Sequence, residues 1–342
     1  MWTRPLAWRV VASGLRPSAV SLLQRVELLL FAIGLASFVF IVGRIGLPEA
    51  ASLASRLGPW LVPIVALGFV PHALDTLGLF LCLLDRGRIG LGYTFAGRLA
   101  GEALNTVLPT ATVGGEVVKA SILGRRAPLE RVAAGVGLTY AVDAFTTMVL
   151  TAVALPVSLP RLDLPVSLRI GLAATVIAGL LGTSIFLHLV HAGRVRAVLG
   201  RLGVIRERLA ASPSPAIPRR VVAAATLALL ASALWSAVEV GLVRYALTGE
   251  RDVAVAIAIA SLSSFVDAVF FFVPGQVGTR EGALAAITAL FGLGSSLGIT
   301  IALVRRVTQV AWALLGYVFF AWLQRSAPVA VPVSSPRAVA AG

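Results

Sequence analysis

The feature that most constrains this chain is a polar pattern that occurs twice, each time inside an apolar stretch. Each copy has an acidic residue, a proline seven positions later and a glutamate seven positions after that: Glu102, Pro109 and Glu116 in the first half, Asp267, Pro274 and Glu281 in the second. Proline stops a helix, and the glycines that follow it favour a loop before the next apolar run. The sequence therefore predicts a duplicated broken helix. In membrane proteins, paired interrupted helices at matching places in two halves indicate a transport site.

Composition identifies the environment of these segments. Hydrophobic residues make up 58% of the 342 residues, charged residues 13%, and the mean hydropathy is +0.94. A soluble domain is about half apolar and about a quarter charged, so this is a polytopic membrane protein. The net charge of +14 lies in short gaps between apolar runs. This placement of the charge favours anionic lipid headgroups as partners, and we expect no binding of nucleic acid.

Six apolar runs have the length of about 20 residues that a membrane-spanning helix needs. They are Val26–Ile45, Leu57–Leu84, Val132–Leu155, Ile170–Val190, Val221–Leu247 and Leu297–Leu323. Two further segments, 91–123 and 253–293, contain the broken-helix pattern and are expected to be re-entrant hairpins, which survive at membrane depth where protein or a watery cavity covers them. The expected fold is an all-α polytopic integral membrane protein, with about six spanning helices and two re-entrant helical hairpins in an inverted repeat.

The basic residues predict the orientation, because cytoplasmic loops are enriched in Lys and Arg. With the N-terminus inside, inner segments hold 20 of the 29 basic residues. Both termini are then cytoplasmic, and the two hairpins enter from opposite sides. A full span by residues 253–273 alone would instead place the C-terminus outside. The expected parts are a cytoplasmic segment 1–25, a membrane half 26–190, a basic cytoplasmic connector 191–220, a second membrane half 221–323 and a disordered tail 324–342.

The two breaks carry the candidate site. A glycine-rich break that opens a half-helix presents backbone N–H groups and the positive end of the helix dipole, which suits phosphate. Each break also has a cation near its glutamate, so it could bind a zwitterionic or phosphate headgroup, or carry a proton. Besides the six residues of the repeat, the candidates are Asn105, Gly114, Gly115, Lys119, Gly275, Gly278 and Arg280. Asn105 and Lys119 are the only asparagine and lysine in the chain. The alternative is structural: the glutamates stabilise a first helical turn, the glycines allow close packing and the cations neutralise the glutamates.

Further charges lie inside the apolar runs, where ionisable residues are costly. Asp143 could pair with Arg305 or Arg306 across the two halves and hold the fold together. The chain shows no nucleotide-binding loop, metal-ligand spacing or nucleophile elbow. We therefore expect no cofactor, no metal site and no enzymatic activity.

The stretch NTVLPTATVGGEVVKASIL followed by Asp143, and the stretch FFVPGQVGTREGALAAITALFGL followed by Arg305 and Arg306, resemble the lysylphosphatidylglycerol synthase transmembrane family, also called flippase-like membrane proteins. The resemblance covers residues 25 to 323 and is similar in wording to a hopanoid-associated branch. It implies a membrane domain that moves a lipid headgroup, with the residues of the two breaks on the family's hairpin motifs. Members that synthesise lysyl-phospholipid have an additional soluble transferase domain, which is not expected here.

The expected function is thus a lipid flippase or transporter in the cytoplasmic membrane of a bacterium, working by alternating access on a phospholipid, a polyprenyl-phosphate-linked lipid or a hopanoid. Replacing Glu116 and Glu281 with alanine should then abolish transport in a folded protein. A second hypothesis is a membrane scaffold that recruits lipid-biosynthetic enzymes through the connector 191–220. A third is an intramembrane transferase or hydrolase with Glu116 or Glu281 as its base.

Overall fold

The structure is a computed structural model. It describes residue 55 and residues 57–107, 113–161, 164–191, 218–270, 273, 276 and 278–325. Within these ranges the regular secondary structure is helical, without strands. The predicted all-α class is therefore confirmed for the described part of the chain. The predicted run Val26–Ile45, the segment 1–25, nearly all of the connector 191–220 and the tail beyond Arg325 lie outside the described residues.

Five of the six predicted spans are present as helical segments that are long and apolar enough to cross a membrane. They are α4 and α5 together (Gly58–Leu67 and Phe69–Cys82), α9 (Leu129–Ser158), α10 (Val166–His191), α13 (Arg219–Thr248) and α16 (Ser295–Arg325). The chain is a multi-pass membrane protein. The boundaries of these spans differ from the predicted ones by a few residues, and two helices extend beyond the predicted membrane halves: α13 begins within the connector and α16 continues to Arg325.

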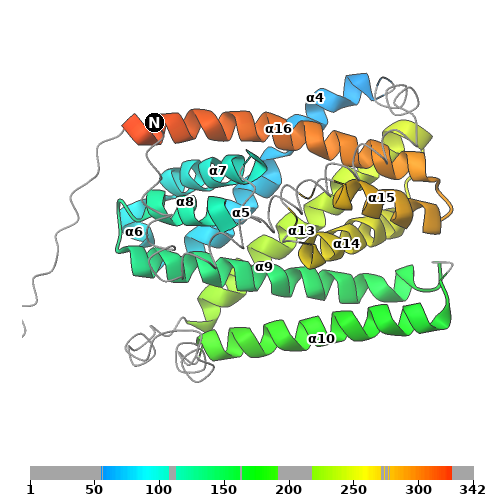
Figure 1. The fold of residues 1–342 in the computed structure, drawn as a ribbon, viewed down its shortest axis with the longest axis horizontal. Helices are drawn as coiled ribbons and strands as arrows, with labels where there is room; N and C mark the ends of the chain where they lie inside the picture. Colours follow the sequence, from blue (N-terminus) through cyan, green and yellow to red (C-terminus); the bar gives the residue numbers. More distant parts are fainter. Residues whose placement is uncertain are drawn as a thin grey trace, which may run out of the picture.

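α16, α9 and α10 lie along the long axis of the molecule, whereas α13 and the segment α4–α5 cross it obliquely (Figure 1). α16 packs against α7 (Leu91–Val107) and α15 (Thr279–Leu290), α5 pairs with α13, and α9 contacts α10, α13 and α14 (Val253–Val269). α10 forms one edge of the bundle, and it carries many exposed aliphatic side chains, among them Ile170, Ile177, Leu181 and Ile185. A large exposed apolar surface on parallel long helices fits contact with lipid chains.

Both predicted breaks are present as pairs of shorter helices. The first pair is α7 (Leu91–Val107) with α8 (Val113–Leu123), preceded by the short α6 (Arg86–Ile89), and the second is α14 (Val253–Val269) with α15 (Thr279–Leu290). α8 has 11 residues and α15 has 12. At 1.5 Å per residue each is about 17–18 Å long, too short for a hydrocarbon core of about 30 Å. Their insertion as re-entrant hairpins remains a prediction.

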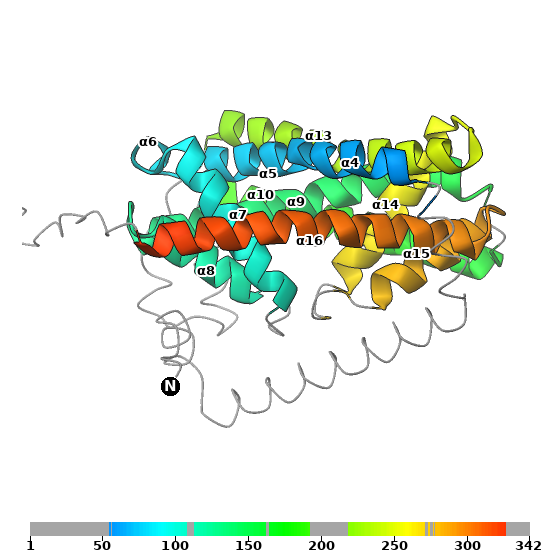
Figure 2. The same cartoon turned by 90° about the horizontal axis from the view of Figure 1, so that it is seen from above.

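The two pairs lie at opposite ends of the long axis, between α16 and α9 (Figures 1 and 2). In each pair the two helices pack against each other. Buried aliphatic clusters hold each pair in place, for example Leu123 and Ala120 beside Val136 at one end and Leu284 beside Ile259 and Ile301 at the other. This arrangement brings two polar breaks, far apart in the sequence, to the centre of an apolar bundle.

Candidate functional site

Arg98 is the centre of the polar cluster beside the first hairpin. Its Nη2 donates to Oδ2 of Asp75 on α5 at 2.6 Å, and its Nη1 lies 3.2 Å from Oε2 of Glu102 and 3.1 Å from Nδ1 of His72. Only 12% of the Arg98 side chain is exposed. A guanidinium bound on two sides by carboxylates is fixed in place as well as neutralised. Arg98 therefore joins α7 to the spanning helix α5.

Asn105 holds the break between α7 and α8. Its Oδ1 accepts the backbone N–H of Gly115 at 2.6 Å. The backbones approach closely here, because a Cβ on Gly115 would lie 2.2 Å from the carbonyl oxygen of Gly101. Helix N-termini leave such N–H groups without intrahelical partners, and Asn105 satisfies this one from the neighbouring helix. The N–H of Gly115 is therefore not free for an anion, contrary to the expectation from the glycine-rich sequence.

Glu116 and Lys119 form the predicted pair one helical turn apart. The Lys119 Nζ donates to both carboxylate oxygens of Glu116, at 2.6 and 2.7 Å. The two side chains are 19% and 12% exposed, and both line a cavity. Since Asn105 caps the first turn of α8, Glu116 is available for a role at the cavity wall.

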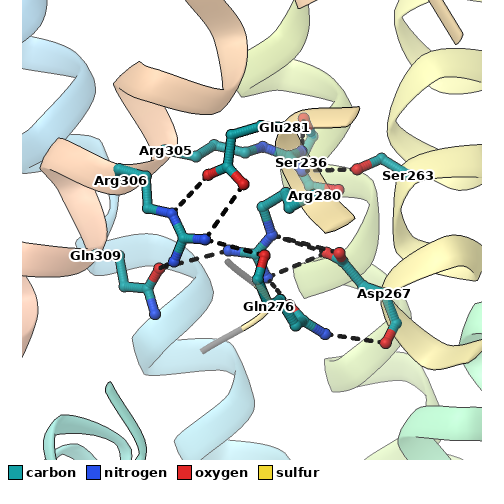
Figure 3. Close-up of polar contacts among 9 residues, drawn as sticks. All are labelled: Ser236, Ser263, Asp267, Gln276, Arg280, Glu281, Arg305, Arg306 and Gln309. Carbon is teal, nitrogen blue, oxygen red and sulfur yellow. Dashed lines mark hydrogen bonds and ion pairs between the residues drawn. The ribbon is translucent and has the colours of Figure 1, made fainter. Parts of the chain in front are cut away.

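The second hairpin is held by Arg280, as Figure 3 shows. Its guanidinium lies 3.1 Å from Oδ2 of Asp267 on α14 and also donates to the side chain of Gln276. Gln276 in turn donates from Nε2 to the carbonyl oxygen of Asp267 at 2.9 Å. Its φ of +50° is uncommon for a residue with a side chain. Such a conformation persists where surrounding contacts impose it, often at a functional site.

Both carboxylate oxygens of Glu281 are bonded within the protein, at the start of α15 and to α16. Glu281 is 1% exposed, and its Oε2 accepts the N–H of Gly278 at 2.8 Å, which caps the helix. Its Oε1 lies 2.7 Å from Nε of Arg306 on α16 (Figure 3). Gly278 has a φ of +83°, which glycine adopts without strain. The Gly278 N–H, like that of Gly115, is thus already bonded, and Glu281 lines neither of the two cavities described next.

One cavity receives side chains from both hairpins. It has a volume of about 270 Å³ and is lined by Arg98, Glu102, Asn105, Glu116 and Lys119 of the first hairpin and by Gln276 and Arg280 of the second. A second cavity of about 230 Å³ lies beside it. Glu102, Arg280 and Gln309 line both cavities. These three side chains therefore stand where the two hollows meet.

Asp143 faces the first of these cavities together with Asp75. Arg306 pairs with Glu281, and Arg305 donates to the Ser263 hydroxyl at 3.4 Å and the Ser236 carbonyl at 3.5 Å (Figure 3). The predicted pairing of Asp143 with either arginine is wrong, because both are held by other groups.

The cavity of about 270 Å³ is lined by four carboxylates and three cations. Unlike the other acids there, Asp143 presents its carboxylate without an ion-pair partner among the described residues.

The structure brings together Glu102, Asn105, Glu116, Lys119 and Arg280 around the cavity, and places Gly114 and Gly115 in the first turn of α8. Asp267 supports Arg280 from behind. Pro109, Pro274 and Gly275 lie outside the described residues.

Sequence reasoning missed several polar residues of the site, among them Arg98, Gln276 and Gln309. A signal existed for two of them. Arg98 stands four positions before Glu102, and Gln309 three positions after Arg306. Each therefore shares a helix face with a charged residue that the sequence analysis named as a candidate. Gln276 lies in the break itself and carries no such periodic signal.

Searches of curated proteins and of solved structures find no match to this chain. A family model does match, described as the lysylphosphatidylglycerol synthase TM region, and it covers residues 26–316. This range includes both hairpins and the cavity between them. The chain belongs to the lysylphosphatidylglycerol synthase TM region family.

Proposed function

We propose that this protein is a lipid flippase or transporter that moves a lipid headgroup through the cavity between its two hairpins. The observation that carries the proposal is the cavity of about 270 Å³, lined by charged side chains of both hairpins inside a bundle of apolar spanning helices. Charges within a membrane are costly and commonly mark a substrate or ion pathway. A headgroup needs such a polar interior, because it cannot cross the hydrocarbon core by itself at low cost.

The lining suits a headgroup that carries both signs of charge. Arg98, Lys119 and Arg280 can interact with a phosphate, and Asp143 can accept from an amine or hydroxyl. A phospholipid with an amine in its headgroup carries both signs, a polyprenyl-phosphate-linked sugar offers phosphate and hydroxyl groups, and a hopanoid with a polar head offers hydroxyl or amine groups alone. Binding and translocation require no covalent chemistry, so we propose transport without enzymatic activity.

Alternating access is the proposed mechanism. Glu102 belongs to the first hairpin, Arg280 to the second and Gln309 to α16, and all three line both cavities. A shift of either hairpin at this point would change the connection between the two hollows. In an inverted repeat with cytoplasmic termini, the hairpins would open toward opposite sides of the cytoplasmic membrane. The scaffold alternative depends on the connector, most of which lies outside the described residues.

The experiment reconstitutes the protein in proteoliposomes and measures the transbilayer movement of headgroup-labelled phospholipids, polyprenyl phosphates and hopanoids. The variant Glu116→Ala removes a cavity carboxylate, and Glu130→Ala removes an exposed glutamate on α9 as the matched control. We expect Glu116→Ala to slow movement by at least about tenfold, equivalent to about 1.4 kcal/mol, and Glu130→Ala to match the wild type. A folded wild-type protein that moves none of these lipids would contradict the proposal.

A further inference from the structure

A third hollow lies on the outer side of α4 and α16. Its volume is about 470 Å³, and it is lined by apolar side chains of both helices, including Val62, Ala66, Val307 and Ala311. Val62 is 74% exposed and Val307 is 45% exposed. Because α4 and α16 belong to segments long and apolar enough to span a membrane, the apolar lining of this groove is compatible with contact to bilayer hydrocarbon.

Trp312 separates the groove from the polar interior. Its side chain lines the groove and also the cavity of about 230 Å³ that contains Glu102 and Arg280. Its ring centroid lies 4.8 Å from that of His72, and its Nε1 donates to the carbonyl oxygen of Val65 at 3.0 Å. One side chain, held to the facing helix by one hydrogen bond, therefore closes the gap between an apolar groove and a charged cavity.

The spanning helix opposite Trp312 turns from α4 into α5 at Gly68, where the backbone stays helical (φ −55°, ψ −17°) and the Gly68 N–H donates to the Ile64 carbonyl oxygen at 3.2 Å. A Cβ on Gly68 would lie 2.6 Å from Nε1 of Trp312, so only glycine leaves room for the indole in this position. Pro71 has no N–H to donate to the preceding turn, which weakens the helix beside Gly68. The partition thus consists of an indole against a stretch of helix that lacks one backbone hydrogen bond.

We propose that the groove between α4 and α16 is a lateral portal, in which the hydrocarbon chain of a bilayer lipid lies while its headgroup passes Trp312 into the polar cavity. The inference rests on the proposed function and names the route of entry. A lipid is amphiphilic, so its chain stays in the hydrocarbon while its head enters the protein. The groove and the cavity meet at Trp312. The apolar groove on one side of this residue matches the hydrocarbon chain, and the charged cavity on the other side matches the headgroup.

The first test asks what occupies the groove. A benzoylphenylalanine photo-cross-linker replaces Val62 in the full chain, reconstituted in vesicles of phosphatidylethanolamine and phosphatidylglycerol. Mass spectrometry then identifies the adduct. A lipid adduct supports the portal. An adduct with the apolar run 26–45 of the same chain, or with a second copy of the chain, overturns it because protein then covers the groove.

The second test fills the groove from either wall. Ala311→Trp on α16 and Ala66→Trp on α4 both place a bulky ring in it, and Leu314→Trp puts the same ring on an exposed site of α16 that does not line it. We expect each filling variant to slow headgroup movement by at least about tenfold, and Leu314→Trp to stay within about twofold of the wild type. The two filling variants are on different helices, so the test remains informative if one of them does not fold.

Two results are decisive. Movement by a folded filling variant at the rate of Leu314→Trp overturns the portal while leaving the proposed function intact. A wild-type protein that moves no lipid overturns the proposed function, and the cross-link at Val62 alone then decides whether a lipid chain occupies the groove.

Discussion

The two hairpins share a sequence pattern but use its second glutamate differently. In α15, Glu281 caps its own helix through Gly278 and binds Arg306, and it is buried away from the cavity. In α8, Asn105 of the neighbouring helix takes the equivalent role at Gly115, which leaves Glu116 at the cavity wall beside Lys119. The residue that satisfies the helix N-terminus therefore decides which glutamate is structural and which is available for a ligand.

The basic residues Arg280 and Lys119 also differ in their roles in the two hairpins. Arg280 of the second hairpin bridges its two helices through Asp267 and still lines the cavity, whereas Lys119 of the first hairpin binds only within its own helix. An ion pair thus joins the two helices of the second hairpin, whereas those of the first are joined by hydrogen bonds from the Gly115 N–H to Asn105 and from the Tyr93 hydroxyl to the Ile122 carbonyl oxygen, and by a close backbone contact. If one hairpin rearranges during transport, the first has fewer charged contacts between its two helices to break.

The largest effect should come from the contact between α7 and α8. Gly115→Ala would place a Cβ 2.2 Å from the Gly101 carbonyl oxygen and 2.3 Å from the Asn105 side chain, so the hairpin cannot close. We expect a protein that does not give a monodisperse peak in size-exclusion chromatography in detergent. The control is Gly92→Ala in α7, where a Cβ meets nothing within 4 Å. A monodisperse Gly115→Ala protein would show that the hairpin tolerates separation of its helices.

The next effect compares the two glutamates directly. Glu281→Ala removes the carboxylate that pairs with Arg306 and the acceptor of the Gly278 N–H. Breaking a buried ion pair from one side costs about 3–5 kcal/mol, which is an upper bound here because Arg306 keeps its hydrogen bonds to the Gln276 carbonyl oxygen at 3.0 Å and to Gln309 at 3.3 Å. Glu281→Gln keeps an acceptor for Gly278 and should lose less. Glu116→Ala should destabilise less than Glu281→Ala, because it leaves Lys119 beside a polar cavity. Thermal unfolding in detergent measures all three.

Equal unfolding temperatures for Glu281→Ala and Glu116→Ala would contradict the division of roles. They would also restore the expectation, drawn from spacing alone, that both glutamates can be removed from a folded protein. The structure argues against this expectation for Glu281, since its two partners are on different elements and both are lost at once.

A smaller effect is expected at Asn105. Asn105→Ala leaves the N–H of Gly115 without its acceptor, which costs about 1–3 kcal/mol. Asn105→Asp keeps the acceptor oxygen and should recover part of this stability. Unfolding temperatures of the two variants, compared in the same detergent, give the contribution of the cap. A loss as large for Asp as for Ala would mean that the added negative charge near Glu116 outweighs the retained hydrogen bond.

The spanning helices were predictable from the sequence, because crossing the hydrocarbon core requires about 20 consecutive, mostly apolar residues. Local pairs at helical spacing, such as Glu116 with Lys119, were predictable for the same kind of reason. The need for glycine at position 68 was not predictable, because the sequence does not show that the indole of Trp312 lies against it.

Tertiary partners were the part that sequence spacing could not supply. Arg280 is next to Glu281 in the sequence, but adjacent side chains on a helix point in different directions, and the structure pairs Arg280 with Asp267 and Glu281 with Arg306. Both choices depend on how α14, α15 and α16 meet. The family likeness locates the hairpin motifs, but it does not state these pairings.

The smallest effect on stability, and the sharpest on function, should come from Asp143→Asn. The carboxylate faces the cavity without an ion-pair partner among the described residues, so the amide fits the same space and stability should change by no more than about 0.5 kcal/mol. The amide oxygen of asparagine can still accept a hydrogen bond, but the variant loses the negative charge that we assign to pairing with a protonated amine in the headgroup. Movement of an amine-bearing lipid in proteoliposomes should fall by at least about tenfold, while a lipid without an amine keeps its rate. Equal loss for both lipids would mean that Asp143 serves the transport cycle itself, and a clear drop in unfolding temperature would mean that it helps to hold the bundle together.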